Sequence, residues 1–246
     1  MLVLPSVSIG NVPQLAIDLL IYTYGFECIK CLDNDDIVPF FGPMDYLGSA
    51  DGSVSEISPK TSQDAKQDAK QDINKIEVAT AVQLYKLGDV YLIQIRSPPV
   101  SGRDVPFLTK LFEDADVKQA MSTDAGQQCI VVGSADAGCH PAGVPSSKIE
   151  DIPKSSVLKE QNSPSLSSQL PSFPDSGYTS TALGMFGTQA VVSWVYEGDN
   201  SIDALELATR IVQLAKLPEK RLVPPISWSR VYGKDIPLGV EEGIYC

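Results

Sequence analysis

The residues best suited to chemistry are five cysteines and one histidine, and their spacing limits what they can do. Cys28 and Cys31 have the C-x-x-C spacing of a zinc knuckle, but Cys129 and Cys139 have nine residues between them and do not. The stretch ECIKCL has the pattern of a strand, whereas a C-x-x-C redox pair opens a helix. We therefore predict no metal site, and reduced, mostly buried thiols typical of cytosolic or nuclear proteins.

One serine and the histidine are the candidates for nucleophilic catalysis. Ser134 follows a short apolar run, a position where α/β proteins often place ligand-binding groups. The sequence GSADAG lacks the G-x-S-x-G pattern of a nucleophile elbow, and spacing alone does not show whether His140 reaches Ser134 as a base. The pattern favours a turn of small residues, so we predict no catalytic residue.

Two further turns precede predicted helices. IGNVPQ, residues 9–14, leads into a helix whose first N–H groups can bind an anion, but it lacks the lysine of a Walker A loop. EGDN, residues 197–200, carries two carboxylates without an evident partner acid or base. Capping explains both turns better, since Asn11 and Gln14 have capping-box spacing and Asp199 suits a turn. We predict no cofactor.

The elements that position these residues alternate in the order of an α/β fold. Gly88 and Asp89 separate two alternating runs and predict a two-residue hairpin turn. The unbroken apolar run QCIVVGS predicts a strand buried on both faces. The predicted strands cover residues 2–9, 26–32, 37–42, the hairpin 78–96, 128–134 and a stretch that begins at 188.

Helical periodicity predicts three helices. The first begins at Asn11, with Pro13 in its first turn; the second covers 104–122, with Asp104 as its cap; the third covers 201–217 and ends before Pro218. Their inner faces are predicted to carry Leu15, Leu19 and Tyr22; Leu108, Leu111, Phe112 and Ala115; and Leu205, Ala208, Val212 and Ala215.

We predict a single α/β domain over residues 1–246, with a mixed sheet flanked by helices on both faces and two long flexible inserts. The first insert, residues 45–75, repeats QDAK and has almost nothing apolar to bury. The second, residues 140–181, is rich in Ser and Pro and poorly patterned. The C-terminal tail, residues 233–246, is expected to follow the surface without adding a layer.

The formal net charge of −12 makes some partners unfavourable. It repels phosphate backbones and anionic lipids, so we expect neither nucleic acid nor a membrane as a partner. No apolar run approaches the roughly 20 residues of a membrane span. The first residues carry no positive charge before Lys30, so they fit a buried strand better than a signal peptide. The charge suits soluble work or a basic protein partner.

Three segments together resemble the proteasome assembly chaperone family, subunit-two type, and especially its fungal members. They are LPSVSIGNVPQLAIDLLI near the start, YEGDNSIDALEL late in the chain and PPISWSRVYG close to the end. LIQIRSPP fits in order between them, so the resemblance covers nearly everything except the two inserts. The inserts are longer than in the family's shorter members, and the resemblance implies no role for them.

The resemblance implies an α/β fold related to the nucleoside phosphorylases, in a protein that is not an enzyme. It also implies a heterodimer with a subunit-one-type chaperone. That heterodimer would bind the outer face of the proteasome α-subunit ring, promote its assembly and prevent off-pathway association. We expect such a protein in the cytoplasm or the nucleus.

The resemblance also gives a role to the last three residues. Ile244, Tyr245 and Cys246 match the C-terminal HbYX motif, which inserts between neighbouring α subunits. A terminal carboxylate can pair with a pocket lysine. Tyr245 adds a large ring with one hydroxyl, and full burial of Ile244 contributes about 1.5–3 kcal/mol.

The sequence leaves the heterodimer surface open. Residues 190–200 and the helix 201–217 are candidates, because Trp194 and Tyr196 would place large apolar groups beside an exposed turn. Burial of both side chains in the core explains them equally well.

A rival function is an enzyme with a nucleoside phosphorylase- or hydrolase-like fold. It would use the turns at Asn11, Ser134 and Asp199 as a nucleoside or phosphate site. The missing base and the missing basic phosphate ligands argue against it.

Overall fold

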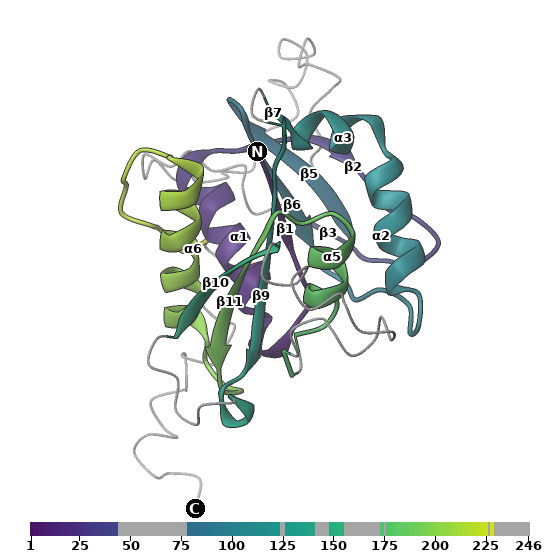
Figure 1. Cartoon of the computed structure of the whole chain (residues 1–246). Coiled ribbons are helices and arrows are strands. Elements are labelled where there is room, and N and C mark those ends of the chain that lie inside the picture. The colour runs from purple at the N-terminus through teal and green to yellow at the C-terminus, as the bar shows by residue number, and fades with distance from the viewer. Residues whose placement is uncertain are drawn as a thin grey trace, which may run out of the picture.

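The apolar strand runs assemble into one seven-stranded sheet with the order β10-β11-β9-β1-β6-β5-β2 (Figure 1). The computed structural model describes residues 1–43, 78–123, 126–140, 148–154, 173–174, 176–225 and 227–228. The predicted insert 45–75 and the predicted tail 233–246 lie outside these residues. The strands of the sheet are β1 (Leu2–Pro5), β2 (Glu27–Cys31), β5 (Val82–Leu87), β6 (Val90–Ile95), β9 (Cys129–Asp136), β10 (Ile149–Pro153) and β11 (Gln189–Val195).

The centre of the sheet is parallel and its two margins are antiparallel. β1 pairs in parallel with β6 and β9, and β9 pairs in parallel with β11. β10, β5 and β2 each pair antiparallel with their inner neighbour. Two small ladders stand apart, formed by β3 (Phe41–Pro43) with β4 (Val78–Thr80) and by β7 (Ser122–Thr123) with β8 (Gly126–Gln127).

Helices cover both faces of the sheet, so the predicted mixed α/β architecture is confirmed (Figure 1). One face packs against α1 and α6, and the other against α2, α3 and α5. Successive side chains of β1 point to opposite faces of the sheet, so Leu2 and Leu4 belong to one apolar cluster and Val3 to the other. Each face therefore needs its own cover of helices. The helices are α1 (Val12–Tyr24), α2 (Asp104–Glu113), α3 (Ala115–Met121), α5 (Thr179–Met185) and α6 (Ser201–Ala215).

The predicted hairpin and the predicted buried strand are confirmed. Leu87 pairs with Val90, and Gly88 has the positive φ of 55° that such a two-residue turn needs. β9 lies between β1 and β11 and is buried along nearly its whole length, because helices cover both of its faces.

The predicted second helix is wrong as one continuous element. The chain breaks at Asp114, whose extended backbone ends α2 and whose carboxylate accepts hydrogen bonds from the first backbone N–H groups of α3. Lys30 on β2 bonds to both Asp114 and Asp116 and ties this break to the sheet. Ala115, which was predicted to lie on the inner face of a helix 104–122, is therefore exposed.

The predicted inner face of the last helix is also wrong at one end. Leu205 is 42% exposed, and the buried stripe of α6 is one position away from it. α6 packs against α1, so its contact stripe is set by the direction in which it crosses α1. The buried residues are Ala204, Leu207, Ala208, Ile211 and Val212.

The predicted second insert, 140–181, is wrong at two places. Residues 149–153 form β10, which pairs with β11 at the edge of the sheet, and residues 179–181 begin α5. β10 reads IEDIP, with too few apolar residues to predict a buried strand, because an edge strand is only half covered. Residues 141–147 and 155–172 lie outside the described residues.

Candidate functional site

The residues predicted to dock on the α-subunit ring, Ile244, Tyr245 and Cys246, lie outside the described residues. The last residues before them that the structure places form a strap along α1. The hydroxyl of Tyr24 donates to the carbonyl oxygen of Pro218 at 2.7 Å, and the backbone N–H of Val223 donates to Thr23 Oγ1 at 2.9 Å. Trp228 packs against the apolar cluster under α1 and α6. The described chain is therefore anchored on the domain as far as Trp228.

The turns at Asn11 and Asn200 and the end of β9 at Ser134 come together at the carboxyl ends of the parallel strands. Gly10 has a φ of 67°, and a Cβ atom there would lie 2.2 Å from Asn200 Nδ2. Only glycine allows the turn after β1 to approach the start of α6 this closely. Sequence spacing predicted the two turns but gave no sign that they touch.

The same edge holds the switch point of the sheet, where open α/β proteins usually bind ligands. From β1 the chain passes through α1 to β2, at one margin of the sheet. From β9 it passes through β10 and α5 to β11, near the opposite margin. The crevice between β1 and β9 is where a ligand would be expected.

Residues of the chain itself use the hydrogen-bonding groups of this crevice. Ser134 Oγ donates to the carbonyl oxygen of Ile9 at 2.6 Å, and the hydroxyls of Ser8 and Ser134 lie 2.8 Å apart. From the other side, Ser6 Oγ donates to the carbonyl oxygen of Ser176 at 2.9 Å. Ser134 is therefore a buried structural hydroxyl, but the turn predicted at this residue is wrong, because β9 continues to Asp136 and the turn follows at Ala137–Cys139.

Tyr178 closes the crevice from the start of α5. Its hydroxyl donates to the carbonyl oxygen of Pro5 at 2.8 Å, and burial raises the pKa of this hydroxyl well above its ordinary value. Gly177 lies so close to β1 that a Cβ atom would stand 2.1 Å from the carbonyl oxygen of Val7. Sequence reasoning missed this plug, because it comes from the stretch predicted to be an insert.

His140 has a partner other than Ser134. Its Nε2 lies 3.1 Å from Glu150 Oε1, on β10, and its ring meets Trp194 edge-on with 4.5 Å between centroids. Ser134 bonds to Ser8 and Ile9 instead. These contacts give the pair no shared hydrogen bond of the kind that a nucleophile and its base need.

The four described cysteines do not form one cluster. Cys129 begins β9 while Cys139 follows the opposite end of that strand, and Cys28 and Cys31 lie on the edge strand β2. Burial raises the pKa of Cys28 to about 11 and that of Cys129 to about 12, which keeps both thiols protonated at neutral pH. Within the described ranges, no group of three or more His, Cys, Asp or Glu side chains is arranged to hold a metal ion.

The capping-box prediction at the start of α1 is wrong. Asn11 has a left-handed backbone and its side chain caps nothing, and Gln14 Nε2 instead donates to the carbonyl oxygen of Ser6 at 3.2 Å. At the start of α6, Asp199 Oδ1 accepts from the backbone N–H of Ser201 at 3.1 Å, whereas the side chain of Asn200 makes no cap bond. Asn200 instead packs against Gly10 between the two turns, whereas Asn11 is exposed.

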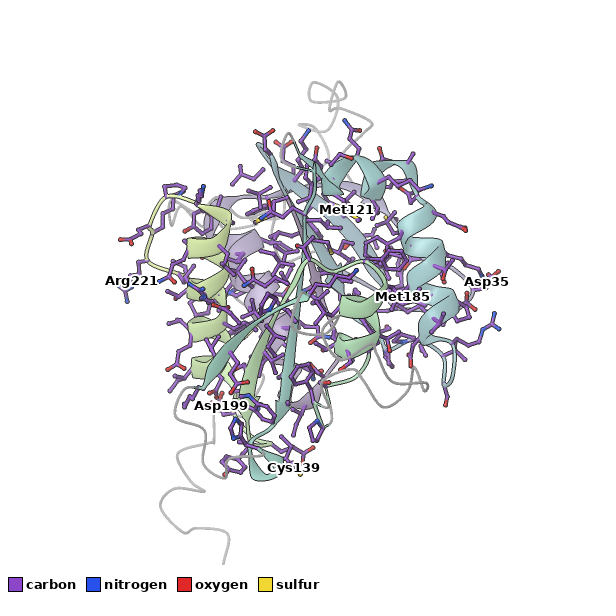
Figure 2. All side chains as sticks on the ribbon, in the orientation of Figure 1. Asp35, Met121, Cys139, Met185, Asp199 and Arg221 are labelled. Atoms are coloured by element: carbon purple, nitrogen blue, oxygen red, sulfur yellow. The ribbon has the colours of Figure 1, made fainter. Side chains whose placement is uncertain are left out.

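The loop after β11 and the start of α6 carry exposed apolar groups next to hollows in the surface. Trp194 is buried, but Tyr196 is 64% exposed and Ile202 is 68% exposed. The segment that the sequence offered as a candidate heterodimer surface thus exposes apolar groups, whereas core burial explains Trp194. Figure 2 shows Asp199 and Cys139 toward this same end of the molecule. Sequence reasoning missed Ile202, which the correct buried stripe of α6 would have placed on the outer face.

None of the described helices is long and apolar enough to cross a membrane.

Comparison with known proteins places the chain by sequence. The profile of the PAC2 family matches residues 2–205. A protein of Saccharomyces cerevisiae named Proteasome assembly chaperone 2 is 37% identical over 102 residues, which are 41% of this chain and 33% of that protein. A protein of Danio rerio with the same name is 30% identical over 104 residues, 42% of this chain and 32% of that protein. The chain thus spans about a third of the length of these curated relatives.

Comparison with solved structures supports the fold. The crystal structure of Pyrococcus furiosus PbaA, described as an archaeal homolog of proteasome-assembly chaperone, superposes with a TM-score of 0.51 at 8% identity. It covers 89% of this chain and 83% of PbaA. A protein of unknown function from Thermoplasma acidophilum gives a TM-score of 0.51 at 12% identity, over 89% of this chain and 77% of that protein. At these identities the similarity concerns the fold alone.

Proposed function

The chain belongs to the PAC2 family, and from that premise we propose that it acts as a proteasome assembly chaperone, by binding and without catalysis. The match over residues 2–205 carries this proposal. The names of the two curated relatives, Proteasome assembly chaperone 2, supply the activity that we propose for this chain.

In this proposal the chain forms a heterodimer with a subunit-one-type chaperone, and the pair binds the outer face of the proteasome α-subunit ring. It promotes ring assembly and prevents off-pathway association. The reduced thiols of the described cysteines suit a cytoplasmic or nuclear location. The formal net charge of −12 suits contact with basic protein surfaces.

The tail is proposed to make the most specific contact with the ring. Ile244 and Tyr245 would enter a pocket between neighbouring α subunits, and the carboxylate of Cys246 would pair with a lysine there. The strap that ends at Trp228 supports this role, because it fixes where the last eighteen residues begin. Fully extended, that length of chain reaches at most about 60 Å.

The rival enzyme function receives no support from the site geometry. It needs an open polar pocket where the turns at Asn11, Ser134 and Asp199 converge. Ser134 bonds instead within the chain, and Tyr178 plugs the crevice beside it.

Deletion of Ile244–Cys246 tests the tail directly. We expect the deletion to weaken binding to α subunits at least about tenfold, because a buried isoleucine alone contributes about 1.5–3 kcal/mol. The heterodimer should keep its affinity, since no part of the described domain is removed. Both affinities are measured by surface plasmon resonance with purified partner chaperone and α subunits.

A matched control keeps the last three residues and changes charge nearby. Glu241→Gln with Glu242→Gln alters the same tail and should leave binding to α subunits within about threefold, since exposed charges contribute little. An unchanged affinity after the deletion would remove the tail from the mechanism.

A further inference from the structure

The surface formed by the start of β10, the loop after β11 and the outer side of α6 has two hollows that share one residue. The first has a volume of about 380 Å³ and lies around the end of β11 and the start of α6. The second, of about 440 Å³, lies between the start of β10 and α6. Lys148 lines both, so the two hollows are neighbours. We call this surface the β10–α6 face; it comprises Lys148, Ile149, residues 194–200, Ile202, Asp203, Leu205, Glu206 and Thr209.

Apolar side chains stand exposed on the β10–α6 face. Tyr196 is 64% exposed, Ile202 is 68% exposed and Leu205 is 42% exposed. Ile202 and Leu205 are three residues apart, which places them on the same side of the helix. α6 already buries a complete stripe against α1 and the sheet, so the core does not account for these residues. Exposed apolar groups gathered in this way mark binding surfaces.

Acidic side chains surround these apolar groups. The hollows are lined by four carboxylates, those of Glu197, Asp199, Asp203 and Glu206. Among the lining residues that the structure describes, Lys148 is the only cation, and it pairs with Asp203 at 3.2 Å. The face therefore has an apolar centre in a field of negative charge.

A buried donor also lines the first hollow. Trp194 is 3% exposed, and its indole N–H finds no acceptor in the described part of the chain. Buried donors are normally satisfied, and an orphan next to a hollow is a place where a partner's oxygen atom would bind favourably.

The edge strand gives the β10–α6 face a firm base. β10 pairs on one side with β11, and no described strand pairs with its other side. Arg210 of α6 bonds to Asp151 of β10, so strand and helix are held together. Pro153 lacks an N–H group, which discourages extension of the sheet at that end of the strand.

We infer that the β10–α6 face binds a partner protein that presents apolar side chains flanked by lysine and arginine. Charge complementarity selects this occupant, because the carboxylates would meet cations around an apolar contact. A second copy of the chain is disfavoured, since a two-fold interface would set the same acidic surface against itself. The inference rests on the proposed function, because the partner to be tested is the subunit-one-type chaperone.

The experiment measures the affinity of the full chain for the purified subunit-one-type chaperone by isothermal titration calorimetry. Ile202→Glu is expected to weaken binding at least tenfold, and Leu205→Ala several-fold. The matched control is Val105→Glu on α2, a residue that is 51% exposed on the other helical layer, and its affinity should be unchanged. Thermal unfolding of each variant verifies that it is folded.

A second measurement tests the charges. Glu197→Gln with Glu206→Gln should weaken binding at about 50 mM salt and have little effect at about 500 mM salt, where exposed charges are screened. The wild-type affinity should fall over the same range. A wild-type affinity that does not depend on salt would overturn the charge complementarity on which the choice of partner rests.

The outcomes separate this inference from the proposed function. If the wild-type chain binds the partner and Ile202→Glu binds equally well, or Val105→Glu loses binding instead, the inference is overturned and the heterodimer stands. If the wild-type chain does not bind the subunit-one-type chaperone, the inference and the proposed heterodimer are both overturned. Loss of binding to α subunits after deletion of the tail concerns the proposed role of the tail alone. If light scattering shows that wild type self-associates and Ile202→Glu abolishes this, the occupant is a second copy and the inference is overturned.

Discussion

At the scale of single residues, serine hydroxyl groups at the carboxyl end of the sheet, where α/β enzymes usually place reacting groups, form structural hydrogen bonds. Ser134 bonds to the turn after β1, and Ser6 bonds to Ser176 across 170 positions of sequence. The first bond joins β9 to the turn after β1, and the second joins that turn to the loop before α5, at the carboxyl end of the sheet. The residues that the sequence marked for chemistry thus hold the edge together.

Ser134→Ala tests this structural role. We expect a loss of about 1–2 kcal/mol in the free energy of unfolding, because the substitution removes a buried hydroxyl and leaves the half-buried carbonyl oxygen of Ile9 without its donor. Binding to the partner chaperone should be unchanged. Urea unfolding followed by circular dichroism measures the stability.

Thr109→Ala is the matched control. It removes a hydroxyl that bonds within the exposed side of α2, so its effect should stay within about 0.5 kcal/mol. Equal effects of the two substitutions would contradict a special role for Ser134. Loss of partner binding in Ser134→Ala, with stability intact, would place this serine in function.

At the scale of elements, a buried carboxylate joins the loop after β2 to α2. Asp36 is 1% exposed, and it contacts Arg103 Nη2 at 2.6 Å and Lys110 Nζ at 2.7 Å. The hydrogen bond from Lys110, and next the contacts with Arg103, hold the pKa of Asp36 below its ordinary value of 3.8 against the opposing effect of burial. The position of α2 over the sheet therefore depends on an ionised Asp36.

The lowered pKa makes the contribution of Asp36 depend on pH. A carboxylate with a depressed folded-state pKa stabilises the fold above its unfolded-state pKa, and this stabilisation is lost as the pH falls through the folded-state value. We expect Asp36→Asn to be less stable than wild type above about pH 5 and the difference to shrink below pH 3.8. Urea unfolding of both proteins at a series of pH values measures this difference in the free energy of unfolding.

Asp35→Asn is the control for this prediction, because Asp35 is exposed in the same loop (Figure 2). Its stability should follow that of wild type at every pH. A stability difference between Asp36→Asn and wild type that stays constant down to pH 2 would show that the ionisation of Asp36 has no role.

At the scale of the whole molecule, the two predicted inserts relate differently to the sheet. Pro43 and Val78 are direct partners in the β3–β4 ladder, so the two described residues that flank residues 44–77 lie side by side. β10, in contrast, lies within the second predicted insert and completes the edge of the sheet. Only the first segment is therefore expected to be dispensable for folding.

Replacement of residues 44–77 by Asn-Gly tests the organisation of the domain. We expect one cooperative unfolding transition and a free energy of unfolding equal to that of wild type or higher by up to about 2 kcal/mol, because a shorter loop costs less entropy to close. Calorimetry and tryptophan fluorescence should give the same midpoint. Deletion of residues 148–154 is the contrast and should lower the midpoint strongly, since it uncovers β11. Two separate transitions in the first variant would contradict a single domain.

The sequence by itself determined the central strands, the hairpin at Gly88 and Asp89, the α/β order and the family, because these follow from local periodicity, turn chemistry and shared segments. The tertiary structure decided which groups are buried and which meet. It placed Leu205 outside, made β10 an edge strand and joined Ser134 to the turn after β1. These outcomes depend on contacts between segments far apart in the chain, and periodicity within one segment carries no information about what packs against it.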